Sequence, residues 1–409
     1  MSKTHRSDNP DTASVGLGHN AADHLGSLKP PIYETSTFVF KTAEEGKRFF
    51  QVAVLHEEPE ADEDLGYIYS RVDNPNLRVA EARLAVWENT EDALVFNSGM
   101  AGISTVFLTY LRPGDLVLHS APLYSGTATL FDWLFTDLGV TAMPFRADVG
   151  PQELESMVGD GSLAMVYVET PANPTNDIFD IADAAGVAHA HGAPLVVDNT
   201  FLSPVWQKPV DHGADLVVHS ATKYLGGHSD LTAGVVCGSA SDIHELRRNR
   251  HRLGSTASPS TAWMLTRSLE TLRLRVERQT QHAITIAAFL ASHPNVASVS
   301  HLSLLDDDDP GIEIYRKQCL GPGAMIALEV VGGEAEAFRF LNAMNLVRLA
   351  VSLGGTESLA SHPWTMTHAT MSPDRKREIG VTPALIRLSI GVEDPNDLMA
   401  DLDQALSQL

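Results

Sequence analysis

Short apolar runs alternate with segments of helical character in the middle of the chain. The runs span residues 93–96, 115–120, 163–170, 193–200, 215–220 and 233–238. Runs of this length without polar alternation are typical of strands buried on both faces, as in a parallel sheet. Strands alternating with helices therefore predict an α/β fold, with a mostly parallel central sheet and helices on both faces.

The flanking regions differ in pattern from this central part. Residues 1–26 are polar and rich in histidine, which predicts a loose arm, and two prolines make Leu28–Phe40 an extended segment. Residues 261–290 have the pattern of long helices, and strands near 323–331 and 384–391 predict a smaller C-terminal α/β unit. We expect an arm and extended segment at 1–66, a large domain at 67–260 and a C-terminal domain at 261–409.

Composition narrows the class of protein. The chain has 409 residues with 29 basic and 52 acidic side chains, a net charge of −23, which argues against nucleic acid or an anionic membrane as partner. Two cysteines are too few for a disulfide framework or a zinc cluster, so no metal site is expected. No signal-peptide pattern is present, and no apolar run reaches the ~18 residues of a spanning helix. We therefore expect a cytoplasmic protein.

Two runs of like charge add little to this picture. Residues 57–64 are strongly acidic and are expected to form a solvated loop. Residues 247–252 are strongly basic, but the run is too short to indicate nucleic-acid binding. It predicts a solvated helix end or a contact between subunits.

Lys223 stands where a buried strand is expected to end. Partial desolvation there lowers an amine pKa and supplies the neutral nucleophile that a Schiff base to an aldehyde cofactor needs. Ser220 and Thr222 beside it can donate hydrogen bonds to a phosphate. Alone, this pattern is also typical of a surface turn.

Asp198 ends the apolar run before that of Lys223. In one parallel sheet both residues would share the carboxyl edge, where such sheets bind ligands. An aspartate against a pyridine nitrogen keeps that nitrogen protonated, so that the ring acts as an electron sink. The alternative interpretation of Asp198 is a helix cap.

Two further segments fit the same chemistry. Ser98, Gly99 and Met100 lie between an expected strand and helix, where backbone N–H groups can bind a phosphate. Neither GxGxxG nor GxxxxGK[ST] occurs, so the usual dinucleotide and triphosphate motifs are absent. Arg387 lies in an apolar strand and requires a carboxylate, from a substrate or from a buried salt bridge.

Taken together, the motifs resemble one enzyme family. The chain resembles the Cys/Met-metabolism pyridoxal-phosphate enzymes from about Leu28 to its end. These enzymes include methionine γ-lyase, cystathionine γ-synthase, cystathionine γ- and β-lyases and O-acylhomoserine sulfhydrylase. The motifs, in the family's order, are YSRVDNPN (69–76), SGM (98–100), ETPANP (169–174), VVDNT (196–200), SATKYLGGH (220–228), SLGGTESL (352–359) and RLSIG (387–391).

The resemblance implies a fold-type I transferase with pyridoxal 5'-phosphate on Lys223. It also implies roles for single residues. Tyr69 and Arg71 would bind the cofactor phosphate of a neighbouring subunit, which requires a homo-oligomer, with a dimer of dimers expected. Tyr124 would stack on the ring and protonate a leaving sulfur, and Asn173 would bind the ring's phenolic oxygen. Ser352 and Thr367 resemble positions near an α-carboxylate clamp formed by Arg387.

The sequence defines less sharply which member of the family this chain resembles most. Val351 replaces the acidic residue that cystathionine-handling γ-enzymes commonly carry there, which favours methionine γ-lyase or a sulfhydrylase. Gly126 replaces the cysteine of methionine γ-lyases and favours the synthases and sulfhydrylases, and Trp364 is expected to narrow the pocket. The hypothesis is a methionine γ-lyase-like enzyme, with γ-replacement as the alternative. An aminotransferase or a non-catalytic binding protein on the same fold are the other classes considered.

Overall fold

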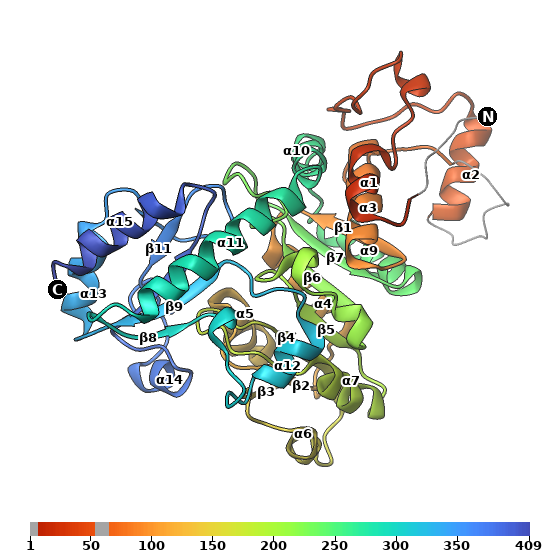
Figure 1. Ribbon diagram of the computed structural model, residues 1–409. Helices are drawn as coiled ribbons and strands as arrows, with labels where there is room; N and C mark the ends of the chain where they lie inside the picture. Colours follow the sequence, from red (N-terminus) through yellow and green to blue (C-terminus); the bar gives the residue numbers. More distant parts are fainter. Residues whose placement is uncertain (1–6, 54–64) are drawn as a thin grey trace.

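The computed structural model describes residues 7–53 and 65–409, and it contains one large and one small β-sheet (Figure 1). The acidic segment 57–64 lies outside the described residues. Within the described ranges, no helix combines the length and the apolar character needed to cross a bilayer.

The large sheet has seven strands in the order β1-β7-β6-β5-β4-β2-β3. All neighbouring pairs are parallel except those of β7, which runs antiparallel to β1 and β6. The prediction of a mostly parallel sheet is therefore confirmed. The strands are β1 (Asp92–Phe96), β2 (Leu116–Ser120), β3 (Thr141–Phe145), β4 (Leu163–Glu169), β5 (Leu195–Asp198), β6 (Leu216–Ser220) and β7 (Gly234–Gly238).

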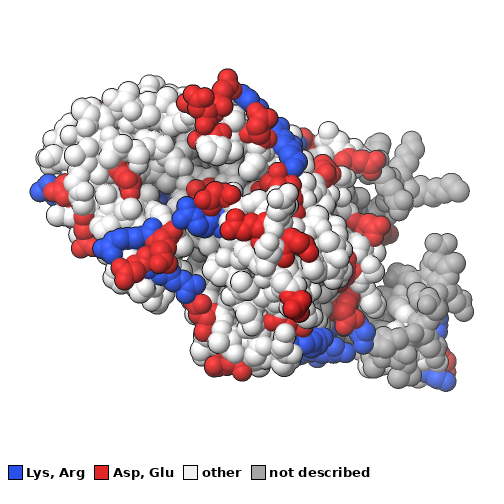
Figure 2. Space-filling view, turned by 90° about the horizontal axis from the view of Figure 1, so that it is seen from below, with Lys and Arg blue, Asp and Glu red and all other residues white. Residues whose placement is uncertain are grey.

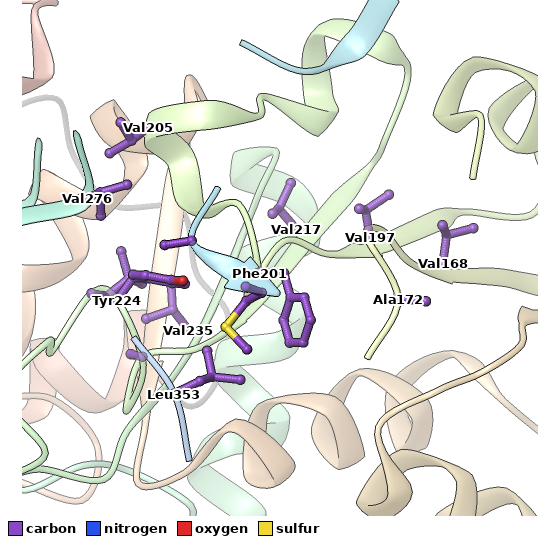
Figure 3. Packing of buried hydrophobic residues seen from close by; sticks show 14 of the residues in the cluster. Val168, Ala172, Val197, Phe201, Val205, Val217, Tyr224, Val235, Val276 and Leu353 are labelled. Carbon is purple, nitrogen blue, oxygen red and sulfur yellow. The ribbon is translucent and has the colours of Figure 1, made fainter. Parts of the chain in front are cut away.

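Successive strand residues enter two different hydrophobic clusters. Val197 and Val217 pack in one cluster, and their neighbours Val196 and Val218 pack in the other. This two-residue period means that both faces of the sheet are buried, so the strands read as continuous apolar runs. Figure 3 shows Val168, Val197 and Val217 of three neighbouring strands in the first cluster.

Helices cover both faces of the large sheet (Figure 1). The first cluster includes residues of α3 (Pro75–Glu88), α6 (Pro151–Val158) and α7 (Ile181–Ala190). The second includes residues of α4 (Gly99–Tyr110), η2 (Leu130–Phe135) and α9 (Ala240–Leu253). Shorter helical segments connect the strands: α5 (Ser125–Thr129), α8 (Ser203–Trp206) and η3 (Pro209–His212).

The C-terminal part is a five-stranded sheet with the order β10-β11-β12-β9-β8. Its strands are β8 (Val296–Ser300), β9 (Met325–Val330), β10 (Arg348–Leu349), β11 (Leu359–Ser361) and β12 (Leu385–Ser389). Two long helices precede it, as predicted: α10 (Pro259–Leu269) and α11 (Leu272–Ala291). The remaining helices are η4 (Leu302–Leu304), α12 (Ile312–Gln318), α13 (Glu334–Ala343), α14 (Pro373–Glu378) and α15 (Pro395–Leu406).

The prediction of a loose N-terminal arm is wrong for the residues around helix α1 (Pro10–Gly16). Asn9 caps this helix by accepting hydrogen bonds from the N–H groups of residues 11 and 12. The buried Trp87 of α3 donates to the Ser14 hydroxyl at 2.7 Å, which docks α1 on the large domain. The segment also holds η1 (Ala21–His24), and residues 28–40 form no helix before α2 (Ala43–Ala53).

The basic run 247–252 lies in the last turns of α9, but it is only partly solvated. Arg250 is fully buried and pairs with Glu81 at 2.6 Å, and Arg247 bridges Glu81 and Asp92. The expectation of a solvated helix end is therefore wrong for these two arginines, because buried carboxylates neutralise them. On the face shown in Figure 2, acidic side chains form scattered clusters with basic groups among them, over a surface made mostly of other residues.

Candidate active site

Three neighbouring strands end at one edge of the large sheet with polar side chains. Glu169 ends β4, Asp198 ends β5 and Ser220 ends β6. Glu169 and Asp198 are register partners, so their side chains lie next to each other. The carboxyl ends of parallel strands are where such sheets bind ligands, and here the chain supplies its chemistry at that edge.

Lys223 follows β6 by three residues and is partly buried. Its Nζ donates to the Ser352 hydroxyl at 2.8 Å. Burial, and secondly the positive charge of Arg387, lowers the pKa of Lys223 to about 8. A substantial neutral fraction of this amine is therefore available as a nucleophile near neutral pH.

Asp198 is buried, and its two carboxylate oxygens differ in the hydrogen bonds that they accept. Oδ1 accepts the N–H and the hydroxyl of Thr200, at 3.0 and 2.5 Å; from the described residues, Oδ2 accepts a single bond, of 3.3 Å, from Tyr167. The helix-cap interpretation is wrong, because the next helix, α8, has Leu202 at its cap position. Burial raises the pKa of Asp198, so a cationic N–H placed at Oδ2 would favour its ionised form.

The start of α4 lies against the end of β6. Ser98 caps the helix by accepting the N–H of Ala101, which leaves the first N–H groups, those of Gly99 and Met100, for another acceptor. A Cβ on Gly99 would approach the Ser220 Cα to 3.1 Å, and one on Gly234 would overlap the Ser98 carbonyl. The chain thus forms a close-packed cradle of the kind that holds phosphate.

Thr222 belongs to the same region, but its hydroxyl is engaged within the chain. It donates to the Ala233 carbonyl at 3.2 Å and accepts from the Ala233 N–H at 3.1 Å. Donation to a phosphate would require this hydroxyl to rotate away from Ala233. Ser220 is the hydroxyl nearer to the helix start.

Tyr124 lies at the start of α5 with its ring partly exposed. Its backbone N–H donates to the Glu169 carboxylate at 2.8 Å, which fixes the loop to the end of β4. The Tyr124 ring and the Met100 sulfur both approach Gly126, at 2.6 and 2.9 Å from where a Cβ would stand. Glycine at this position therefore allows the tyrosine its present place.

Arg387 comes from β12 of the small sheet and is buried. Nη1 donates to the Asn173 side-chain oxygen at 2.9 Å and Nη2 to the Ser352 carbonyl at 2.8 Å, whereas Nε finds no hydrogen-bond partner in the described ranges 7–53 and 65–409. The described residues contain no ion pair to Arg387, so the buried salt-bridge interpretation is wrong. Burial lowers the pKa of Arg387 to about 10, and an incoming carboxylate would compensate this cost.

The loop that carries Ser352 packs directly on the lysine segment. Ser352 has a φ of 88°, a strained value for serine, and it contacts both Lys223 and Arg387. A Cβ on Gly354 would stand 2.8 Å from the Tyr224 nitrogen. Strain at a residue that joins two candidate site groups is typical of a functional site.

Helix α11 holds both of these segments. Arg275 donates to the Tyr224 carbonyl at 2.8 Å, and Gln279 donates to the Gly355 carbonyl at 2.6 Å. The two side chains are one turn apart on the same face of the helix. One helix therefore fixes the lysine segment relative to the serine loop.

Thr367 and Trp364 lie in the segment between β11 and α14. The Thr367 hydroxyl pairs with the buried His368 at 2.9 Å, and burial, with Arg387 as the next cause, lowers the pKa of His368 to about 4. The Trp364 indole packs with Ile379 and Val381, beside Lys376 of α14. The expectation that Trp364 narrows the pocket stays a prediction, since these contacts hold the indole in place without defining the substrate pocket.

Tyr69 and Arg71 are exposed in the single chain. The Arg71 guanidinium lies 5.7 Å from the centre of the Tyr69 ring and donates to the His251 carbonyl at 2.6 Å. The two side chains thus lie together at the surface of the single chain.

A cavity of about 740 Å³ lies elsewhere, between the two sheets. Its lining includes Arg146, Asp177 and Glu329 but none of Lys223, Asp198 and Arg387. Asp177 and Glu329 already accept hydrogen bonds from Thr175 and Thr382. The candidate active site is instead the region around Lys223, where an amine of lowered pKa and the Arg387 guanidinium meet at Ser352.

Sequence reasoning gave no role to Glu169, Thr200 or Tyr167. Thr200 bonds both Asp198 and the Ser220 N–H, so it fixes β5 and β6 at their ends. Glu169 ends an apolar run in the same manner as Asp198, and that signal was available in the sequence. The role of Thr200 depends on a contact across strands that the sequence does not display.

The residues present fit pyridoxal 5'-phosphate. The fit rests on an amine of lowered pKa, a carboxylate with an underused oxygen, a helix start against Ser220 and an arginine with an unpartnered nitrogen. The described residues contain no cluster of three or more potential metal ligands.

Comparison with known proteins gives matches over almost the whole chain. Residues 11–407 match the family model of the Cys/Met metabolism PLP-dependent enzymes. L-methionine gamma-lyases of Pseudomonas putida and Pseudomonas deceptionensis are 42% and 41% identical, covering 97% and 100% of this chain and 96% and 100% of theirs. The structure of cystathionine gamma synthase from Xanthomonas oryzae pv. oryzae is 35% identical, with a TM-score of 0.88 over 98% of both chains.

Proposed function

Because the chain belongs to the Cys/Met metabolism PLP-dependent enzyme family, we propose that it is a methionine γ-lyase-like enzyme. The reaction converts L-methionine and water to 2-oxobutanoate, methanethiol and ammonia. The observation that carries this proposal is the identity of more than two residues in five with two L-methionine gamma-lyases over nearly the full chain. Val351 before the Ser352 loop supports it.

The proposed roles follow from the site. Pyridoxal 5'-phosphate on Lys223 supplies an electron sink for a carbanion next to the amino group. Asp198 keeps the ring nitrogen protonated, and Asn173 binds the phenolic oxygen. Ser98, Gly99, Met100, Ser220 and Thr222 would hold the cofactor's phosphate, and Tyr69 and Arg71 of a second subunit would complete the phosphate site.

The remaining groups act on the substrate. Arg387 binds its α-carboxylate, supported by Ser352 and Thr367. Lys223, with its lowered pKa, carries protons at Cα and Cβ as the general base. Tyr124 stacks on the ring and protonates the departing sulfur at Cγ. Tyr124 and Arg387 both connect to the end of β4, Tyr124 directly and Arg387 through Asn173.

Three finer expectations belong to the same proposal. The enzyme is a homo-oligomer, with a dimer of dimers as the expected form, since Tyr69 and Arg71 are exposed in the single chain. It acts in the cytoplasm. Its domains divide as 1–66, 67–260 and 261–409.

A γ-replacement enzyme is the second candidate. Gly126 favours it, because glycine is the residue that the resemblance assigns to synthases and sulfhydrylases. Such an enzyme joins a thiol or sulfide to Cγ of an O-acylhomoserine, with release of the acid.

The deciding experiment is release of 2-oxobutanoate by the cofactor-loaded protein given L-methionine alone. Release with an equal amount of methanethiol and ammonia supports the lyase. Absence of release, with turnover of O-succinylhomoserine plus cysteine or sulfide, supports γ-replacement. Formation of 2-oxo acid without ammonia would instead indicate an aminotransferase, and failure to bind the cofactor would indicate a non-catalytic protein.

A further inference from the structure

Glu169 is a buried carboxylate without an ion-pair partner among the described residues. Its Oε2 accepts the Tyr124 N–H at 2.8 Å, and its Oε1 accepts the Asn173 N–H at 3.0 Å. A buried carboxylate is costly unless each oxygen is satisfied, and here two separate loops satisfy it. The strand end is thereby tied to both loops at once.

The same contacts continue to the lysine. The Asn173 side-chain oxygen accepts from Arg387, the Ser352 carbonyl accepts from Arg387, and the Ser352 hydroxyl accepts from Lys223. A continuous series of hydrogen bonds thus runs from the Tyr124 backbone through Glu169 to Lys223. Removing a central group of such a series disturbs more than one contact.

Glutamine is not equivalent to glutamate at this position. In either protonation state, both carboxyl oxygens accept hydrogen bonds, whereas an amide nitrogen only donates. A glutamine would therefore direct an NH₂ group at one of the two backbone N–H groups. Burial, and secondly Asp198, raises the pKa of Glu169 to about 8, and Arg387 is the cation that opposes this shift.

From these contacts we infer that Glu169 is a positioning residue, which keeps Tyr124 and the Arg387 clamp in register with each other. It contacts neither group's reactive atoms and acts through the two loops. The inference rests on the proposed function for the roles of Tyr124 and Arg387. It assigns Glu169 no proton transfer.

The test uses full-length, cofactor-loaded Glu169→Gln. The first measurement is the dissociation constant of glycine, which is monitored through the absorbance of the bound cofactor. Glycine carries the α-carboxylate but no sulfur, so this measurement is independent of the physiological substrate. We expect binding to weaken about 10-fold, the scale of one buried backbone N–H group left without its acceptor.

The second measurement is the dissociation constant of pyridoxal 5'-phosphate itself, which requires no amino acid. We expect it to rise several-fold, because Tyr124 no longer holds its place over the ring. With L-methionine, KM should rise and kcat should fall together, since both ends of the substrate are affected. Glu169→Asp keeps both acceptor oxygens but shortens the reach, so it should raise both dissociation constants and KM and lower kcat.

Asp401→Asn is the matched control. Asp401 is also a buried carboxylate, and it accepts the N–H groups of residues 345–347 in the C-terminal domain. We expect this variant to lower the urea midpoint while leaving glycine and cofactor binding unchanged. The comparison separates positioning from a general loss of stability.

Two outcomes would overturn the inference. One is a Glu169→Gln protein that binds glycine and cofactor as tightly as wild type. The other is an equal loss in Glu169→Gln and Asp401→Asn, which would indicate a structural role alone. Wild type that binds glycine but releases no 2-oxobutanoate would refute the lyase proposal and leave the inference on Glu169 standing.

Discussion

A side chain at Gly126 should displace the Tyr124 ring. A Cβ there would stand 2.6 Å from Cε1 of Tyr124 and 2.9 Å from the Met100 sulfur, both inside van der Waals contact. Gly126→Ala introduces only this Cβ, and Gly126→Cys adds a thiol to it. The two variants therefore share one steric change and differ in one chemical group.

The expected changes in stability and in cofactor affinity depend on whether the Tyr124 ring or the backbone moves. Tyr124 is 41% exposed, so its ring can swing outward instead of straining the core. We expect the free energy of unfolding to change by less than the ~1–3 kcal/mol of ordinary overpacking. Loss of ring stacking, ~0.5–1.5 kcal/mol, corresponds to roughly 2- to 12-fold weaker cofactor binding.

Fluorescence titration of the apoprotein with pyridoxal 5'-phosphate measures this change, and urea unfolding measures stability in parallel. Unchanged cofactor affinity in Gly126→Ala would refute the assignment of Tyr124 as the stacking residue. A large fall in stability at constant affinity would mean that the backbone yields and the ring does not. Any gain in L-methionine elimination by Gly126→Cys over Gly126→Ala measures the contribution of the thiol.

Three other predictions concern protonation and packing. Apoprotein and pyridoxal 5'-phosphate should form the visible absorbance band at a rate that rises with pH and levels off above about 8, because the neutral amine of Lys223 is the reacting form. Lys223→Ala should show no band after borohydride treatment and dialysis. The pKa of Glu169 is raised from 4.5 to about 8, so its contribution to apoprotein stability is fully present below pH 4.5 and is lost as pH rises through about 8. The urea midpoint of Glu169→Gln should therefore fall less over this pH range than the urea midpoint of wild type. Gly234→Ala places a Cβ 2.1 Å from the Ser98 carbonyl oxygen and should lower the free energy of unfolding by ~1–3 kcal/mol or more, and an unchanged urea midpoint would contradict the close packing of this cradle.

The central strands could be predicted from sequence because both faces of the sheet are buried. Their apolar runs need no partner to be recognised, and each polar residue that ends a run, such as Asp198, marks the ligand edge. β3 (Thr141–Phe145) was not predicted, because it is an edge strand that is partly exposed and contains Pro144. Periodicity is informative where burial is complete and fails where it is partial.

The contacts between distant segments could not be predicted in this way. Ser352, with its positive φ, meets Lys223 and Arg387, which lie 129 and 35 residues from it in sequence. Arg250 appeared solvated because its partner, Glu81, lies 169 residues away. Such pairings are properties of the folded chain, and local composition carries no record of them.

Helix α11 determines where this protein tolerates being cut or lengthened. Each residue inserted between Arg275 and Gln279 would rotate one side chain by about 100° relative to the other, so only one of the two loops could still be held. Fragments meant to reassemble into a working enzyme should therefore keep 272–291 intact. The connection at 254–258, between α9 and α10, is a poor place to divide the chain, because Ser255 accepts from the Asn97 N–H and Thr256 donates to the Arg71 carbonyl.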